Sequence, residues 1–390
     1  MNHLLSKIGS YPFEKLNLLL KDINPSKEVI NLSIGEPKLN ADLRVLDILN
    51  KETSSFSNYP PMNAVPELSE AYRQYLKSHF GIKNVAEDEV CLVAGTREGT
   101  FSIIQALFNK ENVKEKPYVV MPNPFYQIYG GATTLAGGEA KFLDCPEENN
   151  FQPNLDSLKN EDWQKCQILV LCSPNNPTGS VLPLSKLKDI LGLAEKYDFY
   201  VVSDECYVDL YTSEKSCPSI LQASSDRSDR SDRLIALHSL SKRSNLPGFR
   251  SGFACSGKKT ISAYKKFRSF HGVSVPLPIQ KASVEAWLNH DFVAENRKSY
   301  KDKFSLAADM FKDKVSNVIP EGAFYLWLDV RDGQSFSKKI LEKEGLIVLP
   351  GSYLSAVVNG FNPGEKYVRI ALVYDFETTE VALKRINNLL

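Results

Sequence analysis

One lysine stands in a setting that suits covalent chemistry. Lys242 lies between two short apolar runs, residues 233–237 and 251–255, so we predict a loop between two buried strands. A lysine held in a pocket at a strand end loses its proton more readily than a solvated one, and its neutral amine can attack a carbonyl. The alternative is a hydroxyl-rich turn with exposed cations.

Hydroxyl groups and a guanidinium surround this lysine in the sequence. Ser239 and Ser241 precede it, and Arg250 follows it eight residues later. A guanidinium offers a fork of donors that matches a phosphate. A lysine for an aldehyde, with serines and an arginine for a phosphate, is the set that pyridoxal phosphate requires.

Two further motifs suit the same ligand. Gly95-Thr96-Arg97 ends an apolar run and opens a predicted helix, where backbone N–H groups and a hydroxyl can bind phosphate at the positive helix end. Tyr126 follows the apolar run 118–121 and could lie flat on a heteroaromatic ring. The alternatives are an ordinary strand-to-helix turn and a packed aromatic side chain.

Two charged residues interrupt or end apolar runs. Asp204 ends the run 199–203, and a buried carboxylate needs a partner such as a protonated pyridine nitrogen. Tyr207 and Asn176 could both reach the phenolate oxygen of that ring. Arg369 lies within an apolar run and must face an anion, such as a substrate carboxylate, or solvent. The alternatives are a helix N-cap for Asp204 and an exposed edge-strand position for Arg369.

The elements that must position these residues follow from the apolar pattern. From about residue 90, strand-like apolar runs alternate with helix-like segments, which predicts an α/β fold with a mostly parallel sheet buried on both faces. In such sheets ligands bind beyond the carboxyl ends of the strands, where these motifs lie. The order becomes irregular near the C-terminus. We therefore predict a large domain over residues 45–275 and a smaller α+β domain over 1–44 and 276–390.

Composition argues against several functional classes. The net charge of the 390 residues is zero, whereas a nucleic-acid-binding face needs a basic excess. No apolar run is long enough to span a bilayer or to form a signal peptide. The seven cysteines and five histidines lack disulfide or metal-ligand spacing, so we expect reduced thiols, no metal site and a cytoplasmic protein. Residues 224–233 contain a threefold Ser-Asp-Arg repeat that predicts a surface loop, with a binding role as the alternative.

Together these motifs resemble the class I/II pyridoxal-phosphate aminotransferases of fold type I. The resemblance covers nearly the whole chain, and the motifs occur in the family's order. They are Gly35-x-Pro37, Tyr59-Pro60, Gly95-Thr96-Arg97, Asn176-Pro177-Thr178-Gly179, Asp204-x-x-Tyr207, Ser239-x-Ser241-Lys242 with Arg250, and Arg369.

The resemblance implies a role for each position. Lys242 would bond to the cofactor and move the proton between the substrate α-carbon and the cofactor. Asp204 would pair with the ring nitrogen, Asn176 and Tyr207 with the ring oxygen, and Tyr126 would stack on the ring. The phosphate ligands would be Thr96, Arg97 by its backbone, Ser239, Ser241, Arg250 and, from the neighbouring subunit of a homodimer, Tyr59.

Substrate binding is also implied by the resemblance. Arg369 would hold the substrate α-carboxylate, with Gly35 and Asn176 beside it, and two half-reactions would alternate through pyridoxamine phosphate. Four segments resemble bacterial N-succinyl-L,L-diaminopimelate aminotransferases of lysine biosynthesis, which use glutamate and 2-oxoglutarate as the other pair. They are residues 11–16, 31–38, 240–248 and 362–372. Lys38 is the candidate cation for a distal substrate carboxylate, with Arg243 second; a solvated lysine is the alternative.

Other reactions share these motifs. Another class I aminotransferase, acting on aspartate, alanine, aromatic amino acids or LL-diaminopimelate, is one alternative. A β-eliminating lyase or a cyclopropane-forming synthase would use the same cofactor. A non-catalytic regulator that keeps the cofactor as a ligand would carry a separate DNA-binding domain, for which we expect no room before Tyr11.

Overall fold

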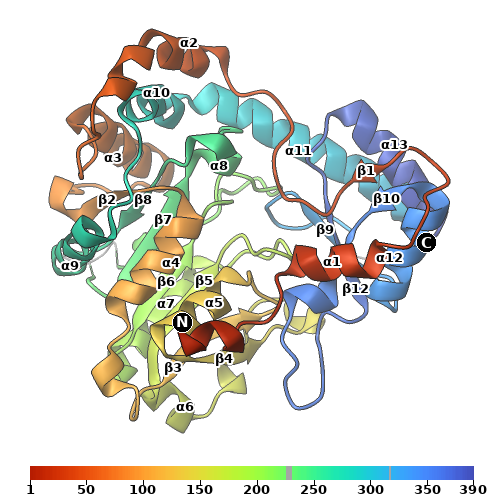
Figure 1. The fold of residues 1–390 in the computed structure, drawn as a ribbon, viewed down its shortest axis with the longest axis horizontal. Helices are drawn as coiled ribbons and strands as arrows, with labels where there is room; N and C mark the ends of the chain where they lie inside the picture. Colours follow the sequence, from red (N-terminus) through yellow and green to blue (C-terminus); the bar gives the residue numbers. More distant parts are fainter. Residues whose placement is uncertain (225–230, 316–317) are drawn as a thin grey trace.

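The computed structural model describes residues 1–224, 231–315 and 318–390 (Figure 1). Most of the predicted Ser-Asp-Arg loop, residues 225–230, lies outside the described residues. Within them, the largest sheet has seven strands in the order β2-β8-β7-β6-β5-β3-β4. The strands are β2 Val90–Val93, β3 Tyr118–Asn123, β4 Glu139–Asp144, β5 Cys166–Cys172, β6 Tyr200–Asp204, β7 Leu234–Ser239 and β8 Gly252–Cys255.

This sheet confirms the predicted α/β fold. β8 runs antiparallel to β2 and β7, and the other described pairings are parallel. Alternate residues of β5 enter two cores: Ile168 and Val170 pack with α4 and α5, whereas Leu169 packs with α7. Burial on both faces explains the continuous apolar runs. The polar edge strand β4 was not predicted, because its pattern is half-exposed.

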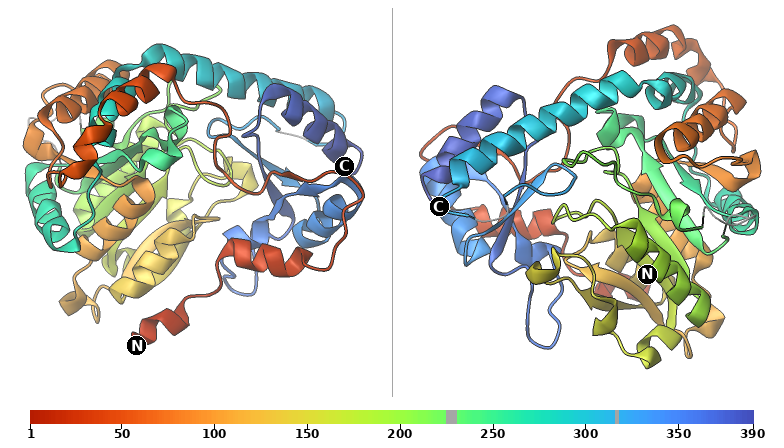
Figure 2. Two further views of the ribbon diagram at one scale, coloured as in Figure 1. Left: turned by 45° about the horizontal axis from the view of Figure 1, so that its top comes forward. Right: turned by 180° about the vertical axis from the view of Figure 1, so that it is seen from behind.

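Helices cover both faces of the sheet and connect it to the second part of the molecule (Figures 1 and 2). None of the described helices is long and apolar enough to cross a membrane. The helices are α1 Pro12–Leu20, α2 Leu43–Lys51, α3 Pro66–Phe80, α4 Thr96–Leu107, α5 Ile128–Ala136, α6 Asn160–Gln164, α7 Leu184–Tyr197, α8 Leu240–Arg243, α9 Lys258–His271, α10 Leu277–Leu288, α11 His290–Phe311, α12 Gly333–Glu344 and α13 Phe376–Asn387.

A smaller three-stranded sheet lies in the C-terminal part, in the order β11-β12-β9. Its strands are β9 Tyr325–Asp329, β11 Leu349–Pro350 and β12 Tyr367–Ala371, and β12 is antiparallel to both neighbours. The N-terminal segment joins this part, because β1 Ile30–Asn31 pairs with β10 Leu346–Ile347 and α1 packs against α12. Within residues 29–34, only Ile30–Asn31 form a strand.

Candidate active site

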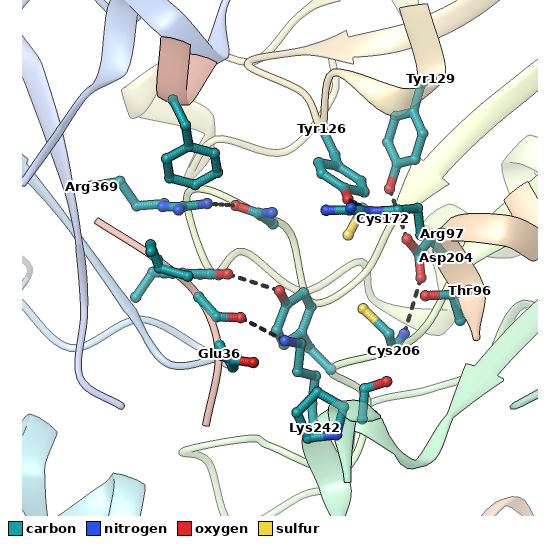
Figure 3. A pocket seen from close by; sticks show the side chains of 18 of the residues that line it. Glu36, Thr96, Arg97, Tyr126, Tyr129, Cys172, Asp204, Cys206, Lys242 and Arg369 are labelled. Carbon is teal, nitrogen blue, oxygen red and sulfur yellow. Dashed lines mark hydrogen bonds between the residues drawn. The ribbon is translucent and has the colours of Figure 1, made fainter. Parts of the chain in front are cut away.

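A cavity of about 490 Å³ is lined by residues of both sheets and of the N-terminal segment (Figure 3). It brings together most of the residues that the sequence singled out. Those that line it are Gly35, Thr96, Arg97, Tyr126, Asn176, Asp204, Tyr207, Ser241, Lys242, Arg250 and Arg369.

Lys242 is half-buried and reaches into the cavity from the short helix α8. Ser239 caps this helix, because its Oγ accepts a hydrogen bond from the Ser241 amide at 3.1 Å. Lys242 Nζ donates to the Gly35 carbonyl at 2.6 Å. Burial lowers the pKa of Lys242 to about 8, because the charged amine loses its solvation. The alternative of two exposed cations therefore does not hold for Lys242, whereas Arg250 is exposed at the rim of the same cavity.

Asp204 is a buried carboxylate at the end of β6, 3% exposed. It accepts hydrogen bonds from the Tyr129 hydroxyl at 3.1 Å and the Cys206 amide at 3.3 Å. A turn rather than a helix follows it, so the helix N-cap alternative is wrong. Burial raises its pKa, and no cationic side chain of the described residues lies within 4 Å. A protonated ring nitrogen would supply the partner that this carboxylate lacks.

An anion cradle forms where α4 begins. The first amides of a helix have no acceptor within it, and Thr96 and Arg97 bring those of α4 to the cavity. The guanidinium of Arg250 donates to the carbonyls of Pro247 and Ala94, each at 2.9 Å, and lines the same cavity. Gly95 has a φ of +80°, a conformation that favours glycine, and a Cβ there would also meet this guanidinium. These donors fit a phosphate.

Arg97 contributes its side chain as well as its backbone. Its Nε donates to the Tyr126 hydroxyl at 2.6 Å, and its terminal nitrogen donates to the Tyr11 hydroxyl at 3.3 Å. Figure 3 shows the guanidinium beside the Tyr126 ring. The sequence predicted only a backbone contact here, so the side chain is an additional cation at the cavity.

Arg369 is 4% exposed and lies on β12, the central strand of its sheet. The edge-strand alternative is therefore wrong. Its guanidinium donates to Asn176 Oδ1 at 2.8 Å and to the Ser33 carbonyl at 2.6 Å. Its Nε is buried without a hydrogen-bond partner among the described residues. An anion in the cavity would complete this donor set.

Four predicted residues lie away from the cavity. Ser239 lies behind it, with its hydroxyl 2.9 Å from that of Ser241. Tyr59 is fully exposed on this chain, as a residue reaching a neighbouring subunit would be. Lys38 forms a half-exposed ion pair with Glu36 at 2.8 Å. Arg243 as a substrate contact is wrong, because it is 1% exposed and bonds to Asp209 at 3.0 Å on the far side of α8.

Several lining residues were missed by sequence reasoning. Tyr325 stands in an apolar strand, where a tyrosine is ordinarily a core residue, and Tyr129 belongs to no motif. Glu36 lies in the recognised Gly-x-Pro turn, whose middle residue could have been flagged as a charged group at a ligand-binding turn. The missed residues that line the cavity are Tyr11, Phe13, Ile34, Glu36, Tyr129, Cys172, Cys206, Pro247 and Tyr325.

Comparison with known proteins decides the family. Residues 27–386 match the model of aminotransferase class I and II. The chain belongs to the class I and II aminotransferases. The family depends on pyridoxal phosphate and acts on amino acids and 2-oxo acids. The lone carboxylate of Asp204, the cradle at α4 and the amine of Lys242 fit this cofactor.

Similar proteins span the whole chain. The LL-diaminopimelate aminotransferase of Natranaerobius thermophilus is 28% identical over 98% of each chain. An aminotransferase of Neisseria meningitidis has a structure with a TM-score of 0.94 and 37% identity, covering 100% of each chain. The aminotransferase AspB of Helicobacter pylori has a TM-score of 0.90 and 36% identity, covering 97% of this chain and 98% of its own. This chain is therefore a full-length match to aminotransferases.

Proposed function

We propose that this aminotransferase exchanges an amino group between N-succinyl-L,L-diaminopimelate and 2-oxoglutarate, in lysine biosynthesis, as a cytoplasmic homodimer. The observation that carries this proposal is a pair of arginines at the cavity, Arg97 and Arg369. Neither has a carboxylate within 4 Å among the described residues. Glutamate, 2-oxoglutarate and the succinylated substrate all carry a second carboxylate beyond the reacting centre, which two separate guanidinium groups can bind.

The residues of the chain divide the work of the reaction. The bound cofactor supplies an electron sink for the charge left when the α-proton departs. Arg369 binds the substrate α-carboxylate and so orients the α-carbon toward Lys242. Lys242 Nζ accepts the α-proton, because a pKa of about 8 leaves part of the amine neutral near neutral pH.

Three further side chains hold the ring in its reactive state. Asp204 keeps the ring nitrogen protonated, and its burial strengthens the pairing. Asn176 and Tyr207 bind at the ring oxygen, and Asn176 Oδ1 also accepts from Arg369 at 2.8 Å. The side-chain amide of Asn176 thus contacts both the arginine that binds the substrate carboxylate and the ring oxygen of the cofactor.

LL-diaminopimelate is the second candidate amino donor. It is the substrate in the name of the Natranaerobius relative. Its distal end carries a free ammonium beside the carboxylate, whereas the succinylated compound has an amide there. Glu36 lines the cavity and would bind that ammonium in place of its ion pair with Lys38.

Steady-state kinetics with 2-oxoglutarate would separate the candidates. The panel is N-succinyl-L,L-diaminopimelate, LL-diaminopimelate, aspartate, alanine and an aromatic amino acid. We expect the highest kcat/KM for the succinylated compound. A higher value for LL-diaminopimelate would make LL-diaminopimelate the amino donor instead. Release of ammonia or pyruvate without formation of glutamate would show a lyase instead.

Arg97→Gln tests the distal contact. We expect KM for 2-oxoglutarate to rise about tenfold or more, the size of a lost charged hydrogen bond, with little change for pyruvate, which lacks the distal carboxylate. Lys38→Ala is the comparison, because Lys38 is the competing candidate and pairs with Glu36. A raised KM in Lys38→Ala but not in Arg97→Gln would return the distal role to Lys38.

A further inference from the structure

One phenol at the cavity has no part in the proposed mechanism. Tyr325 opens β9 and is 1% exposed, yet its side chain lines the cavity. Its hydroxyl oxygen lies 2.9 Å from that of Tyr207. A Cβ at Gly35 would overlap the Tyr325 hydroxyl, so the glycine makes room for this phenol. The hydroxyl is therefore held at a defined position.

The ring of the same residue packs against the arginine proposed to bind substrate. The Cζ of Arg369 lies 4.3 Å from the ring centroid of Tyr325. Arg369 pairs across the sheet with Trp327, and Tyr325 stands two residues earlier on the same face of β9. Tyr325 thus contacts both Arg369, on β12 of the three-stranded sheet, and Tyr207, in the turn that follows β6 of the seven-stranded sheet.

The charge of Arg369 makes Tyr325 the better hydrogen-bond donor of the two phenols. Burial raises the pKa of Tyr325, and the nearby guanidinium opposes this rise. Burial raises the pKa of Tyr207 well above its usual range. We therefore expect the Tyr325 hydroxyl to donate to the Tyr207 oxygen, which leaves the Tyr207 proton for an acceptor in the cavity. The other ionisable groups that face Tyr325 are Cys172, Cys206 and Tyr300.

We propose that Tyr325 is a positioning residue. Through it, the pairing of Arg369 with an anion changes the strength of the hydrogen bond that Tyr207 donates. While Arg369 is free, Tyr325 donates strongly and Tyr207 gives a strong hydrogen bond at the cofactor ring oxygen. A substrate carboxylate neutralises the guanidinium, which weakens both hydrogen bonds in series. The inference rests on the proposed roles of Arg369 and Tyr207, and it links substrate binding to the state of the ring.

The test compares wild-type holoenzyme with Tyr325→Phe, which keeps the ring against Arg369 and removes the hydroxyl. The readout is the pH midpoint of the visible absorbance, with and without saturating maleate, an unreactive dicarboxylate. Maleate should raise the pH midpoint of the wild-type absorbance. When the charge of Arg369 is neutralised, nearby groups keep their protons to a higher pH. In Tyr325→Phe this rise should fall to about half or less, because the hydrogen-bonded route is lost.

Steady-state kinetics give a second readout for Tyr325→Phe. With glutamate, kcat should fall about three- to tenfold, the size of one hydrogen bond, while KM changes less than about twofold. Tyr300→Phe is the matched control, because Tyr300 is a buried phenol outside the cavity with no hydroxyl partner among the described residues. It should leave the maleate shift and kcat unchanged.

A double variant tests whether the effect passes through Tyr207. In a Tyr207→Phe background, Tyr325→Phe should add nothing further. The inference would be overturned, and the proposed function left intact, by either of two results. One is a maleate shift in Tyr325→Phe as large as in the wild type. The other is a Tyr325→Phe substitution that reduces the maleate shift as much in the Tyr207→Phe background as in the wild type. A wild-type protein without a visible band, or without a maleate shift, would overturn the proposed function and the inference together.

Discussion

The reactivity of Lys242 follows from where its amine is held. Burial lowers its pKa to about 8, so the neutral amine increases as pH rises through that value. We predict that the apoenzyme takes up added pyridoxal phosphate faster as pH rises from 7 to 8 and that the rate levels off above about 9. Stopped-flow absorbance measures this rate. A rate that still climbs toward pH 10.5 would show an ordinary, solvated lysine.

Asp204 is the other residue whose surroundings define its chemistry. Asp204→Asn removes the charge opposite the ring nitrogen and nearly preserves the shape of the side chain. We expect kcat to fall about 100-fold or more, as when a buried charge pair is broken, and cofactor to bind more weakly. Tyr129→Phe removes one hydrogen bond to the same carboxylate and should cost about fivefold. Equal losses in the two variants would contradict the ion pair.

At this scale the sequence predicted charged residues that stand in or beside an apolar run, and it missed other lining residues such as Glu36 and Tyr325. Lys242, Asp204 and Arg369 are recognisable because each places a charge in or beside an apolar run. Tyr325 is not, because a tyrosine in a strand is ordinary core, and only the pairing of β9 with β12 brings it to Arg369. The side chain of Arg97 was missed because its direction depends on Tyr11, which is distant in sequence.

At the scale of elements, a four-residue helix carries the reactive lysine and needs outside support. Asn296 of α11 donates to the carbonyls of Lys242 and Arg243, at 3.1 and 3.2 Å. Arg243, one residue after the lysine, forms a buried ion pair with Asp209 and donates to the Ala286 carbonyl of α10 at 2.9 Å. These contacts fix α8 to two long helices.

We predict that Asp209→Ala destabilises the protein strongly. It leaves the Arg243 guanidinium buried without its counter-ion, which costs about 3 kcal/mol or more in the free energy of unfolding. Urea denaturation followed by circular dichroism measures the loss. Asp302→Ala, which breaks the exposed pair with Lys298 on α11, should leave the unfolding midpoint unchanged. Similar midpoints for the two variants would contradict the anchoring role of the buried pair.

At the scale of the whole molecule, the sequence predicted the parallel sheet and the irregular C-terminal part. Continuous apolar runs identify strands buried on both faces, and these define the large sheet. The exposed edge strand β4 and the two-residue strand β10 leave no such pattern. The domain boundaries at 45 and 275 and the homodimer stay predictions, with Tyr59 expected to reach the neighbouring subunit.

Mixing two variants, each of which lacks one residue of the proposed shared site, tests whether two subunits contribute to that site. In a dimer of Tyr59→Ala and Lys242→Ala subunits, one site has both Lys242 and the partner's intact tyrosine. We therefore expect mixing and exchange of subunits to restore high cofactor affinity in that site, measured by titration of visible absorbance. A sedimentation experiment showing only monomers, or mixtures no better than Tyr59→Ala alone, would contradict the shared site.

The central claim is that pyridoxal phosphate is held through Lys242 and exchanges amino groups there. The visible spectrum of the purified protein tests it most directly. We predict a visible absorption band that glutamate bleaches and 2-oxoglutarate restores. We predict that the Lys242→Ala variant lacks this band and does not respond to the two substrates in this way. A colourless protein that takes up no added cofactor, or a Lys242→Ala variant with the same band and cycle, would contradict the claim.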